Sequence, residues 1–154
     1  MQIEQAAFND HQAIASLLSE AKLPVPDERD SPVHFLIARE KGRLIGCLGW
    51  ERYENRCLLR SLAVDKGVRR QGIATALVTA ALAYLKAQGV SEFYLLTNDA
   101  ADFARRFHFI SCDRHELPPG IQSSRQIATN CCASAVCMRL EDVRLCAEST
   151  SLAP

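Results

Sequence analysis

The feature that most constrains this 154-residue chain is a predicted strand, turn and helix that follow one another between residues 57 and 88. Residues 57–64 are mostly apolar and favour a buried strand, whereas residues 73–88 are rich in Ala and Leu and favour a helix. The polar turn between them carries two arginines and Gly72. Amide groups at a helix start have no intrahelical partner, and a glycine lets a phosphate approach the backbone. The segment therefore predicts an anion site, with a pyrophosphate as the expected ligand.

Periodicity and turn signals predict the remaining elements. They are a helix at 10–22 capped by Asp10, a loop at 23–32, strands at 33–39, 44–51 and 57–64, a helix at 73–88 ended by Gly89, a strand at 92–97, a short helix at 99–106 and a last strand at 133–139. A strand, helix and strand in succession form a right-handed crossover, so the strands at 57–64 and 92–97 are expected to be parallel. The predicted fold class is α+β: one domain at 1–140, whose mixed antiparallel sheet has one parallel strand-helix-strand crossover and flanking helices, followed by a C-terminal tail at 141–154.

Composition and charge exclude several classes of protein. Apolar residues make up 48% of the chain and charged residues 23%, which is the balance of a globular domain rather than a disordered chain. Basic and acidic residues number 18 each, so the expected partners include neither nucleic acid nor an acidic membrane surface. The longest near-apolar stretch, 73–85, is too short to span a bilayer, and no export signal is visible at the N-terminus. We therefore expect a cytoplasmic protein.

Seven cysteines are many for such a chain, but their number is odd. Cys47 and Cys57 lie in apolar runs, where a free cysteine behaves as a small hydrophobic residue. Cys131, Cys132 and Cys137 form a cluster without the paired spacing of a zinc site, so no metal is expected. A thiol-based arsenic binder that uses these three cysteines is left open as an alternative.

The turn resembles the signature of the GNAT family, the acetyl-CoA-dependent N-acetyltransferases. Residues 69–74, Arg-Arg-Gln-Gly-Ile-Ala, match the family pattern Arg/Gln-x-x-Gly-x-Gly/Ala, and they match neither the Walker pattern nor Gly-x-Gly-x-x-Gly. Residues 62–64 before the turn, the strand at 94–98 and the short helix at 101–109 are also similar to the family. Several short segments, such as 59–64, 101–103 and 133–138, resemble the acetyltransferases encoded with arsenic-resistance operons, and a looser similarity extends to the acetyltransferase domain of N-acetylglutamate synthase. The resemblance implies acetyl-CoA as co-substrate and a small-molecule amine, an amino acid or analogue, as acceptor, with a homodimer left open.

The resemblance also implies roles for individual residues. The Leu62 amide would face the acetyl carbonyl, where negative charge develops during transfer, and Val64 would pair with the pantetheine arm. The full set of implied cofactor contacts is Leu62, Ala63, Val64, Arg69, Arg70, Gln71, Gly72, Ile73, Ala74, Thr75, Asn98 and Phe103. Many family members protonate the departing thiolate with a tyrosine at a position that is Ala104 here. No Ser-His-Asp or Cys-His arrangement is visible either, so direct attack by the amine is expected, with Ser61, Tyr94 and Thr97 as the polar candidates for catalysis or acceptor binding.

Arg60 is the candidate for holding an acceptor carboxylate. A guanidinium within an apolar strand needs a negative partner, which is either Glu51 on the neighbouring strand or the substrate. Regular alternation would place Arg60 and Leu62 on one face of the strand, so that Arg60 reaches the acetyl site. Protein or peptide N-terminal acetylation and a catalytically weak CoA-binding sensor stay as alternative functions, and we expect His108 to be a surface or turn residue.

Overall fold

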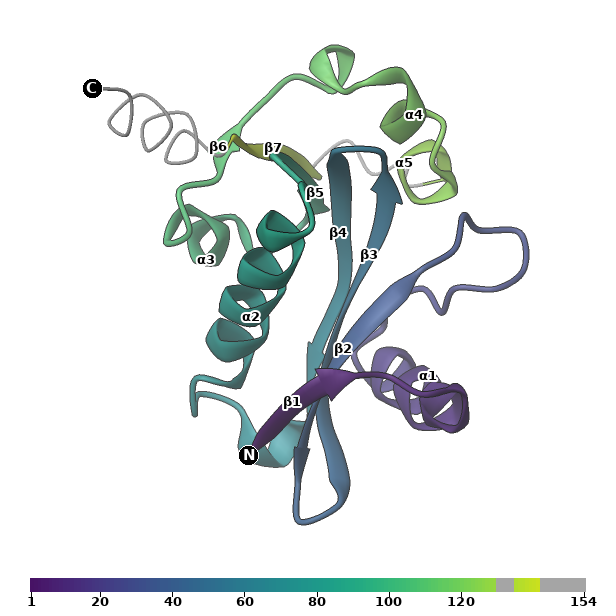
Figure 1. Cartoon of the computed structure of the whole chain (residues 1–154), viewed down its shortest axis with the longest axis vertical. Coiled ribbons are helices and arrows are strands. Elements are labelled where there is room, and N and C mark those ends of the chain that lie inside the picture. The colour runs from purple at the N-terminus through teal and green to yellow at the C-terminus, as the bar shows by residue number, and fades with distance from the viewer. Residues whose placement is uncertain (130–134, 142–154) are drawn as a thin grey trace. The chain divides into compact units, whose positions relative to one another are not determined.

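The computed structural model describes residues 1–129 and 135–141. Seven strands are hydrogen-bonded in the order β1-β2-β3-β4-β5-β7-β6 (Figure 1). The chain divides into two compact units: a first unit of Met1–Glu51 and Leu59–Gln88, and a second unit of Arg52–Leu58 and Gly89–Pro154. Strands β3 and β4 each contribute residues to both units.

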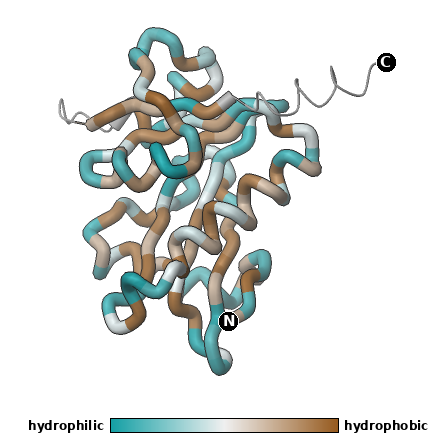
Figure 2. Tube along the Cα trace, turned by 90° about the vertical axis from the view of Figure 1, so that its left-hand side faces the viewer, coloured by the Kyte–Doolittle hydropathy of each residue, from teal (hydrophilic) through white to brown (hydrophobic). Residues whose placement is uncertain are grey.

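The first unit contains the N-terminal elements. These are β1 (Gln2–Gln5), the 3-10 helix η1 (Phe8–Asp10), α1 (His11–Glu20), β2 (His34–Glu40), most of β3 (Arg43–Tyr53), the end of β4 (Arg56–Val64), the 3-10 helix η2 (Lys66–Val68) and α2 (Ile73–Ala87). Strands β2 and β3 form an antiparallel hairpin. Lys41 and Gly42 at its tip both have positive φ angles, which matches the right-handed twist of the hairpin. Along the trace, hydrophobic residues lie in the strands and helices, and hydrophilic residues lie at the turns (Figure 2).

Helices α1 and α2 cover opposite faces of this part of the sheet. Leu17 and Leu18 of α1 belong to a buried cluster with Cys47 of β3. The adjacent Gly46 faces α2 so closely that a Cβ atom there would lie 3.1 Å from the side chains of Ile73 and Leu77. Since consecutive strand residues point to opposite faces, the sheet lies between the two helices. Because Gly46 has no side chain, the first turns of α2 can pack close to the sheet.

The second unit contains the start of β4 and the C-terminal elements. These are β5 (Glu92–Thr97), α3 (Ala101–Arg105), β6 (Ile110–Ser111), the 3-10 helix η3 (Arg114–Glu116), α4 (Pro119–Gln122), α5 (Arg125–Thr129) and β7 (Val136–Glu141). Arg56, Cys57 and Leu58 of β4 pair in parallel with Glu92, Phe93 and Tyr94 of β5, which confirms the predicted crossover. Strand β7 runs antiparallel to both β5 and β6. Leu58, Leu96, Leu117, Ile121 and Cys137 contribute to the buried core of this unit.

The structure corrects several details of the prediction. Asp10 does not cap α1, because its carboxylate accepts hydrogen bonds from the Ala7 amide at 2.7 Å and from Arg39. Strands β1 and β6 and helices α4 and α5 were not predicted, and α3 is shorter than expected. The last strand begins at Val136, and residues 133–134 of the predicted strand lie outside the described residues. The predicted boundary at 140/141 falls at the end of β7, and residues 142–154 of the expected tail also lie outside the described part.

Candidate functional site

The candidate residues divide between the two units. Arg60 and all the residues from Ser61 to Thr75 belong to the first unit, whereas Tyr94, Thr97, Asn98 and Phe103 belong to the second.

The turn that follows β4 is anchored by Asp65. The Asp65 amide donates to the carbonyl of Ile45 at 2.8 Å, and its carboxylate accepts from the Gly67 amide at 2.8 Å. Arg43 pairs with the same carboxylate at 2.5 Å. The Gly67 amide, followed by the charge of Arg43, holds the pKa of Asp65 below its usual value. The turn therefore leaves the strand at a fixed point and in a fixed direction.

The last part of the turn presents amide groups to solvent. Arg70 and Gly72 both have left-handed φ angles, +65° and +79°, and the Ala76 amide makes the first bond of α2, to the Gly72 carbonyl at 2.9 Å. Within the part of the chain that the structure describes, the amides from Arg70 to Thr75 donate no hydrogen bond. A Cβ atom at Gly72 would meet no atom within 4 Å. These orphan donors at the positive end of a 15-residue helix, beside an open glycine, fit a phosphate group.

The other residues expected to contact the cofactor are placed as follows. Gln71 and Thr75 are exposed, Ala74 is partly exposed, and Ile73 is buried against the sheet. The side chain of Arg69 folds back, and its Nε donates to the carbonyl of Val64 at 3.1 Å. Leu62 and Val64 are partly exposed, whereas Ala63 is buried in the cluster beneath α1. Arg69 therefore contacts the end of β4 rather than the exposed amides of the turn.

Ser61 interrupts the alternation of β4. It lies within the strand but has a φ of +61°, a left-handed conformation that is uncommon for a residue with a side chain. Arg60 pairs with Glu51, and Ala63 packs in the same cluster as Cys47. Glu51 and Cys47 are four residues apart on β3 and share a face, so Arg60 and Ala63 share that face too. The prediction that Leu62 lies on the face of Arg60 is wrong, because the irregular residue between them shifts the alternation by one.

Arg60 is buried between two carboxylates. Its Nη1 lies 2.9 Å from Glu51 Oε2 and 3.4 Å from Asp30 Oδ1, and its Nε donates to Ser61 Oγ at 3.1 Å. The Arg60 side chain is 3% exposed and that of Glu51 is 1% exposed. Of the two alternatives left open by the sequence, the ion pair with Glu51 is present. Asp30 was not anticipated as a second partner.

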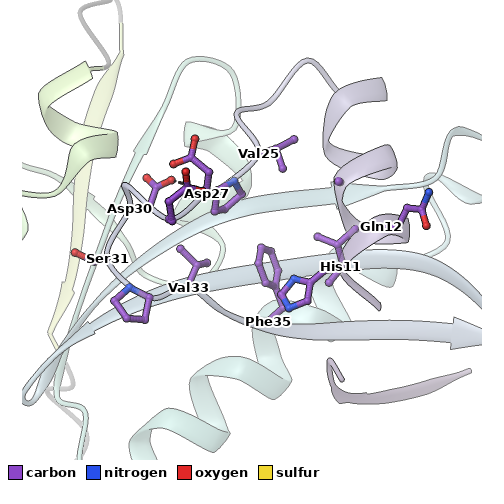
Figure 3. Close-up of a pocket in the computed structure, with 13 residues that line it drawn as sticks. His11, Gln12, Val25, Asp27, Asp30, Ser31, Val33 and Phe35 are labelled. Carbon is purple, nitrogen blue, oxygen red and sulfur yellow. Dashed lines mark hydrogen bonds between the residues drawn. The ribbon is translucent and has the colours of Figure 1, made fainter. Parts of the chain in front are cut away.

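A pocket of about 580 Å³ lies beside this network in the first unit (Figure 3). His11 and Gln12 line it from α1, Phe35 lines it from β2, and Asp27 and Asp30 line it from the segment between them. Its remaining lining residues are Ile14, Ala15, Val25, Pro26, Glu28, Ser31, Pro32 and Val33. The cavity thus combines an apolar wall with carboxylates, and Asp30 connects it to Arg60. Sequence patterns did not predict this pocket, although three acidic residues in a proline-rich loop offered a negative partner for a buried arginine.

In the second unit, the hydroxyl of Tyr94 donates to Glu92 Oε1 at 2.8 Å. Glu92 also pairs with Arg56 at 2.8 Å. Burial, reinforced by the Glu92 carboxylate, raises the pKa of Tyr94. The phenol is therefore a hydrogen-bonded core group that resists losing its proton.

The other candidates of this unit lie around α3. Thr97 Oγ1 accepts from the amides of Asp99 at 3.3 Å and Ala100 at 2.9 Å, so the threonine holds the turn before the helix. Asn98 is exposed, and Phe103 packs edge-to-face with Phe107 at a ring separation of 5.3 Å. Ala104 is buried. His108 is exposed with a φ of +71°, which confirms its assignment to a surface turn.

The described cysteines are protonated thiols at neutral pH. Burial raises the pKa of Cys47, Cys57 and Cys137 to about 12 and also raises the pKa of Cys112. Among residues 1–129 and 135–141, no group of three or more His, Cys, Asp or Glu side chains is arranged to hold a metal ion. None of the helices in these same ranges is long and apolar enough to cross a membrane. Cys131 and Cys132 lie outside the described residues.

The comparison with known families decides the class of the protein. Residues 2–109 match the model of the acetyltransferase (GNAT) family. The chain belongs to the GNAT family. A curated relative, the uncharacterized N-acetyltransferase CT2212 of Chlorobaculum tepidum, is 32% identical over 111 residues, which are 71% of this chain and 69% of the relative.

Two solved structures of enzymes share the fold of this chain. N-acetylglutamate synthase from Neisseria gonorrhoeae, complexed with coenzyme A and N-acetyl-glutamate, superposes with a TM-score of 0.76 at 19% identity. The match covers 91% of this chain, which spans only about a third of that enzyme (34%). The ribosomal-protein-S18-alanine N-acetyltransferase from Escherichia coli superposes with a TM-score of 0.69 at 18% identity, over 91% of this chain and 92% of the other. The protein is thus a GNAT acetyltransferase that uses acetyl-CoA as co-substrate.

Proposed function

We propose that this GNAT acetyltransferase transfers the acetyl group of acetyl-CoA to the primary amine of a small molecule, an amino acid or amino-acid analogue, by direct attack. The observation that carries the proposal is the turn before α2, where the amides from Arg70 to Thr75 donate no hydrogen bond in the described part of the chain. In this proposal they bind the pyrophosphate, and Arg70 adds positive charge beside them. We extend the acceptor class to analogues encountered in arsenic resistance, on the resemblance of residues 59–64 and 101–103.

Direct attack by the amine on the thioester, without an acyl-enzyme, is supported because no described cysteine is activated as a nucleophile. All four described cysteines have raised pKa values, so none forms a thiolate readily at neutral pH. When bound, acetyl-CoA supplies a thioester whose carbonyl carbon is attacked by the amine. The CoA thiol is released as the carbon–sulfur bond breaks. The Leu62 amide is our candidate donor to that carbonyl. Ala104 cannot donate a proton, so we assign the proton of the departing thiol to water or to the acceptor itself.

The acceptor is proposed to occupy the pocket in the first unit. Its volume of about 580 Å³ is in the range of small-molecule sites. Asp30, on its wall, accepts from Arg60, and Arg60 donates to Ser61, the residue before Leu62. This chain of contacts links the pocket to the proposed acetyl position within one unit. Arg60 is already paired with two carboxylates, so we assign it to anchoring Asp30 rather than to binding the acceptor directly.

The test is an assay of CoA thiol release with three panels of acceptors: free amino acids and their analogues, simple alkylamines, and peptides with a free N-terminus. We expect turnover with members of the first panel and at least tenfold lower kcat/KM with the others. Turnover confined to peptides would overturn the small-molecule acceptor. If acetyl-CoA binds in calorimetry and no panel is acetylated, the protein is a CoA-binding sensor and the proposed function is wrong.

The position of the acceptor is tested on α1. Ala15 lines the pocket, whereas Ala13, two residues earlier on the same helix, is exposed and does not. Ala15→Phe should raise the KM for the acceptor at least tenfold and leave the KM for acetyl-CoA within twofold of wild type. Ala13→Phe is the matched control and should change neither. Equal acceptor KM values for the two variants would contradict an acceptor in this pocket.

A further inference from the structure

Two cysteines of the second unit lie next to each other. The Sγ atoms of Cys112 and Cys137 are 3.2 Å apart, although the residues are 25 positions apart in the chain. Both are free thiols. The other two described cysteines, Cys47 and Cys57, are fully buried in the sheet, and Cys47 donates to the carbonyl of Ser61. The close approach of two thiols therefore distinguishes Cys112 and Cys137 from these two.

The backbone brings the two cysteines together independently of their side chains. Strands β6 and β7 pair Ile110 with Arg139 and Ser111 with Met138, so the same register places Cys112 opposite Cys137. The Cys112 amide donates to the Cys137 carbonyl at 2.8 Å, which continues the ladder to this pair. Directly opposed residues of a hydrogen-bonded antiparallel pair have Cα atoms about 5.5 Å apart. Disulfides bridge Cα atoms about 4.4–6.8 Å apart, so the spacing of a directly opposed pair falls within the range of a disulfide.

The two thiols differ in access. Cys112 is partly exposed just after the edge strand β6, whereas Cys137 is 4% exposed in the core beneath α4. A reagent in solution would therefore meet Cys112 first, and Cys137 would be the nearest thiol to any group attached there. This is the arrangement of an attacking and a resolving cysteine.

We propose that Cys112 and Cys137 form a reversible intramolecular disulfide by exchange with a small disulfide such as oxidised glutathione. The Cys112 thiolate attacks one sulfur of the small disulfide, which forms a mixed disulfide and releases one small thiolate. The Cys137 thiolate then attacks the Cys112 sulfur and releases the second small thiolate. The two protons lost by the cysteines are taken up by the two released thiolates, so two protein thiols are oxidised and one small disulfide is reduced to two thiols. The inference does not rest on the proposed function.

The bond would close a loop that contains α4 and α5. Cross-linking residues this far apart removes conformational freedom from the unfolded chain. For a chain of this size we expect the oxidised protein to unfold about 5–10 °C above the reduced protein. The disulfide would thus be a redox-dependent staple between β7 and the segment that follows β6.

The experiment uses the full chain with Cys131→Ser and Cys132→Ser, because trypsin then gives peptides 107–114 and 126–139 with one cysteine each. The reduced protein is treated with oxidised glutathione at pH 8.5, since burial raises the pKa of Cys112, and free thiols are then blocked with an alkylating reagent. We expect the two peptides to be recovered as one disulfide-linked species that dithiothreitol separates. The thermal midpoint should rise on oxidation. Cys112→Ser in the same background should abolish both changes, and Cys57→Ala is the matched control that should abolish neither.

Two outcomes would overturn the inference. One is recovery of both peptides alkylated, or of Cys112 held only as a stable mixed disulfide with glutathione, after prolonged treatment. The other is a link from Cys112 to Cys146, Cys47 or Cys57 instead of Cys137. Because Cys112 is partly exposed, its serine variant is expected to fold, which circular dichroism verifies before oxidation.

Discussion

Arg60 and Glu51 form a buried ion pair across β3 and β4, with 2.9 Å between Nη1 and Oε2 and side chains at most 3% exposed. Asp30 Oδ1 lies 3.4 Å from the same Nη1 atom. Two buried carboxylates thus pair with the same guanidinium. Removal of the arginine would leave both charges buried without their shared partner.

Arg60→Met should therefore lower the free energy of unfolding by about 3–5 kcal/mol, the usual cost of removing one partner of a buried ion pair. Chemical denaturation at pH 7 measures the change. Arg105→Met removes an exposed ion pair with Asp102 and should cost no more than about 1 kcal/mol. Equal losses for the two variants would mean that the buried pair contributes no more than a surface pair.

Two substitutions at Gly72 distinguish the effect of charge at the anion site from the effect of backbone conformation. Both Gly72→Asp and Gly72→Asn put a side chain at a φ of +79°, and both residue types tolerate the left-handed region better than most. Only aspartate adds negative charge beside the exposed amides. We expect the Kd for acetyl-CoA to be at least tenfold higher for Gly72→Asp than for Gly72→Asn, or about 1.4 kcal/mol. Calorimetry on folded variants decides, and equal affinities would remove the turn from the binding site.

Tyr94→Phe tests whether the phenol takes part in catalysis. Its hydroxyl is bound to Glu92 at 2.8 Å and its pKa is raised, so it is a poor proton donor and a poor base near neutral pH. We expect kcat to fall by less than about 100-fold, below the usual contribution of general acid–base catalysis. The free energy of unfolding should fall by about 1–3 kcal/mol, because a hydrogen bond to a charged group is lost. Undetectable turnover with intact acetyl-CoA binding would make Tyr94 a catalytic residue.

The lowered pKa of Asp10 predicts how the free energy of unfolding depends on pH. The hydrogen bond from Arg39, followed by that from the Ala7 amide, lowers the pKa of Asp10 from its ordinary 3.8. A carboxyl whose folded pKa is lowered stabilises the fold above its unfolded pKa, and this contribution disappears as the pH falls through the folded pKa. The stability difference between wild type and Asp10→Asn should thus be constant from about pH 7 to 5 and shrink below about pH 4. Denaturant titrations across this range measure it. A stability difference that stays the same down to about pH 3 would contradict this role of Asp10.

The sequence predicted the elements whose signals are local. The strand, turn and helix from β4 to α2 were found because apolar runs, basic residues and a glycine follow one another in the chain. Strand β1 has only four residues, and its place in the sheet comes from pairing with β2 more than thirty residues away. The two-residue strand β6 likewise exists through its pairing with β7. Such elements carry too little local signal to be predicted.

In the candidate site, too, features with a local sequence signal were predicted and features set by tertiary contacts were not. The pairing of Arg60 with Glu51 was one of two alternatives predicted from charge, because a buried guanidinium requires a carboxylate from the protein or from the substrate. The face of Leu62 was assigned wrongly, since a left-handed serine inside a strand has no sequence signature. Asp30 and the pocket depend on where the proline-rich segment before β2 packs, which is set by tertiary contacts. The sequence therefore predicted features that depend on residue type, but it did not predict how one element packs against another.

The left-handed backbone conformation of Ser61 also limits how the sequence of β4 can change in length. Every side chain after it lies on the face opposite to the one that regular alternation would assign. Gain of a single codon near position 61 would move Ala63 out of the core and turn Leu62 and Val64 to the other face, whereas loss of codon 61 itself would restore regular alternation and keep Ala63 on the face of Arg60. A substitution at these positions alters one side chain, but an insertion alters all of them together. We therefore expect natural variation in this strand to occur as replacements, with insertions confined to the turns on either side.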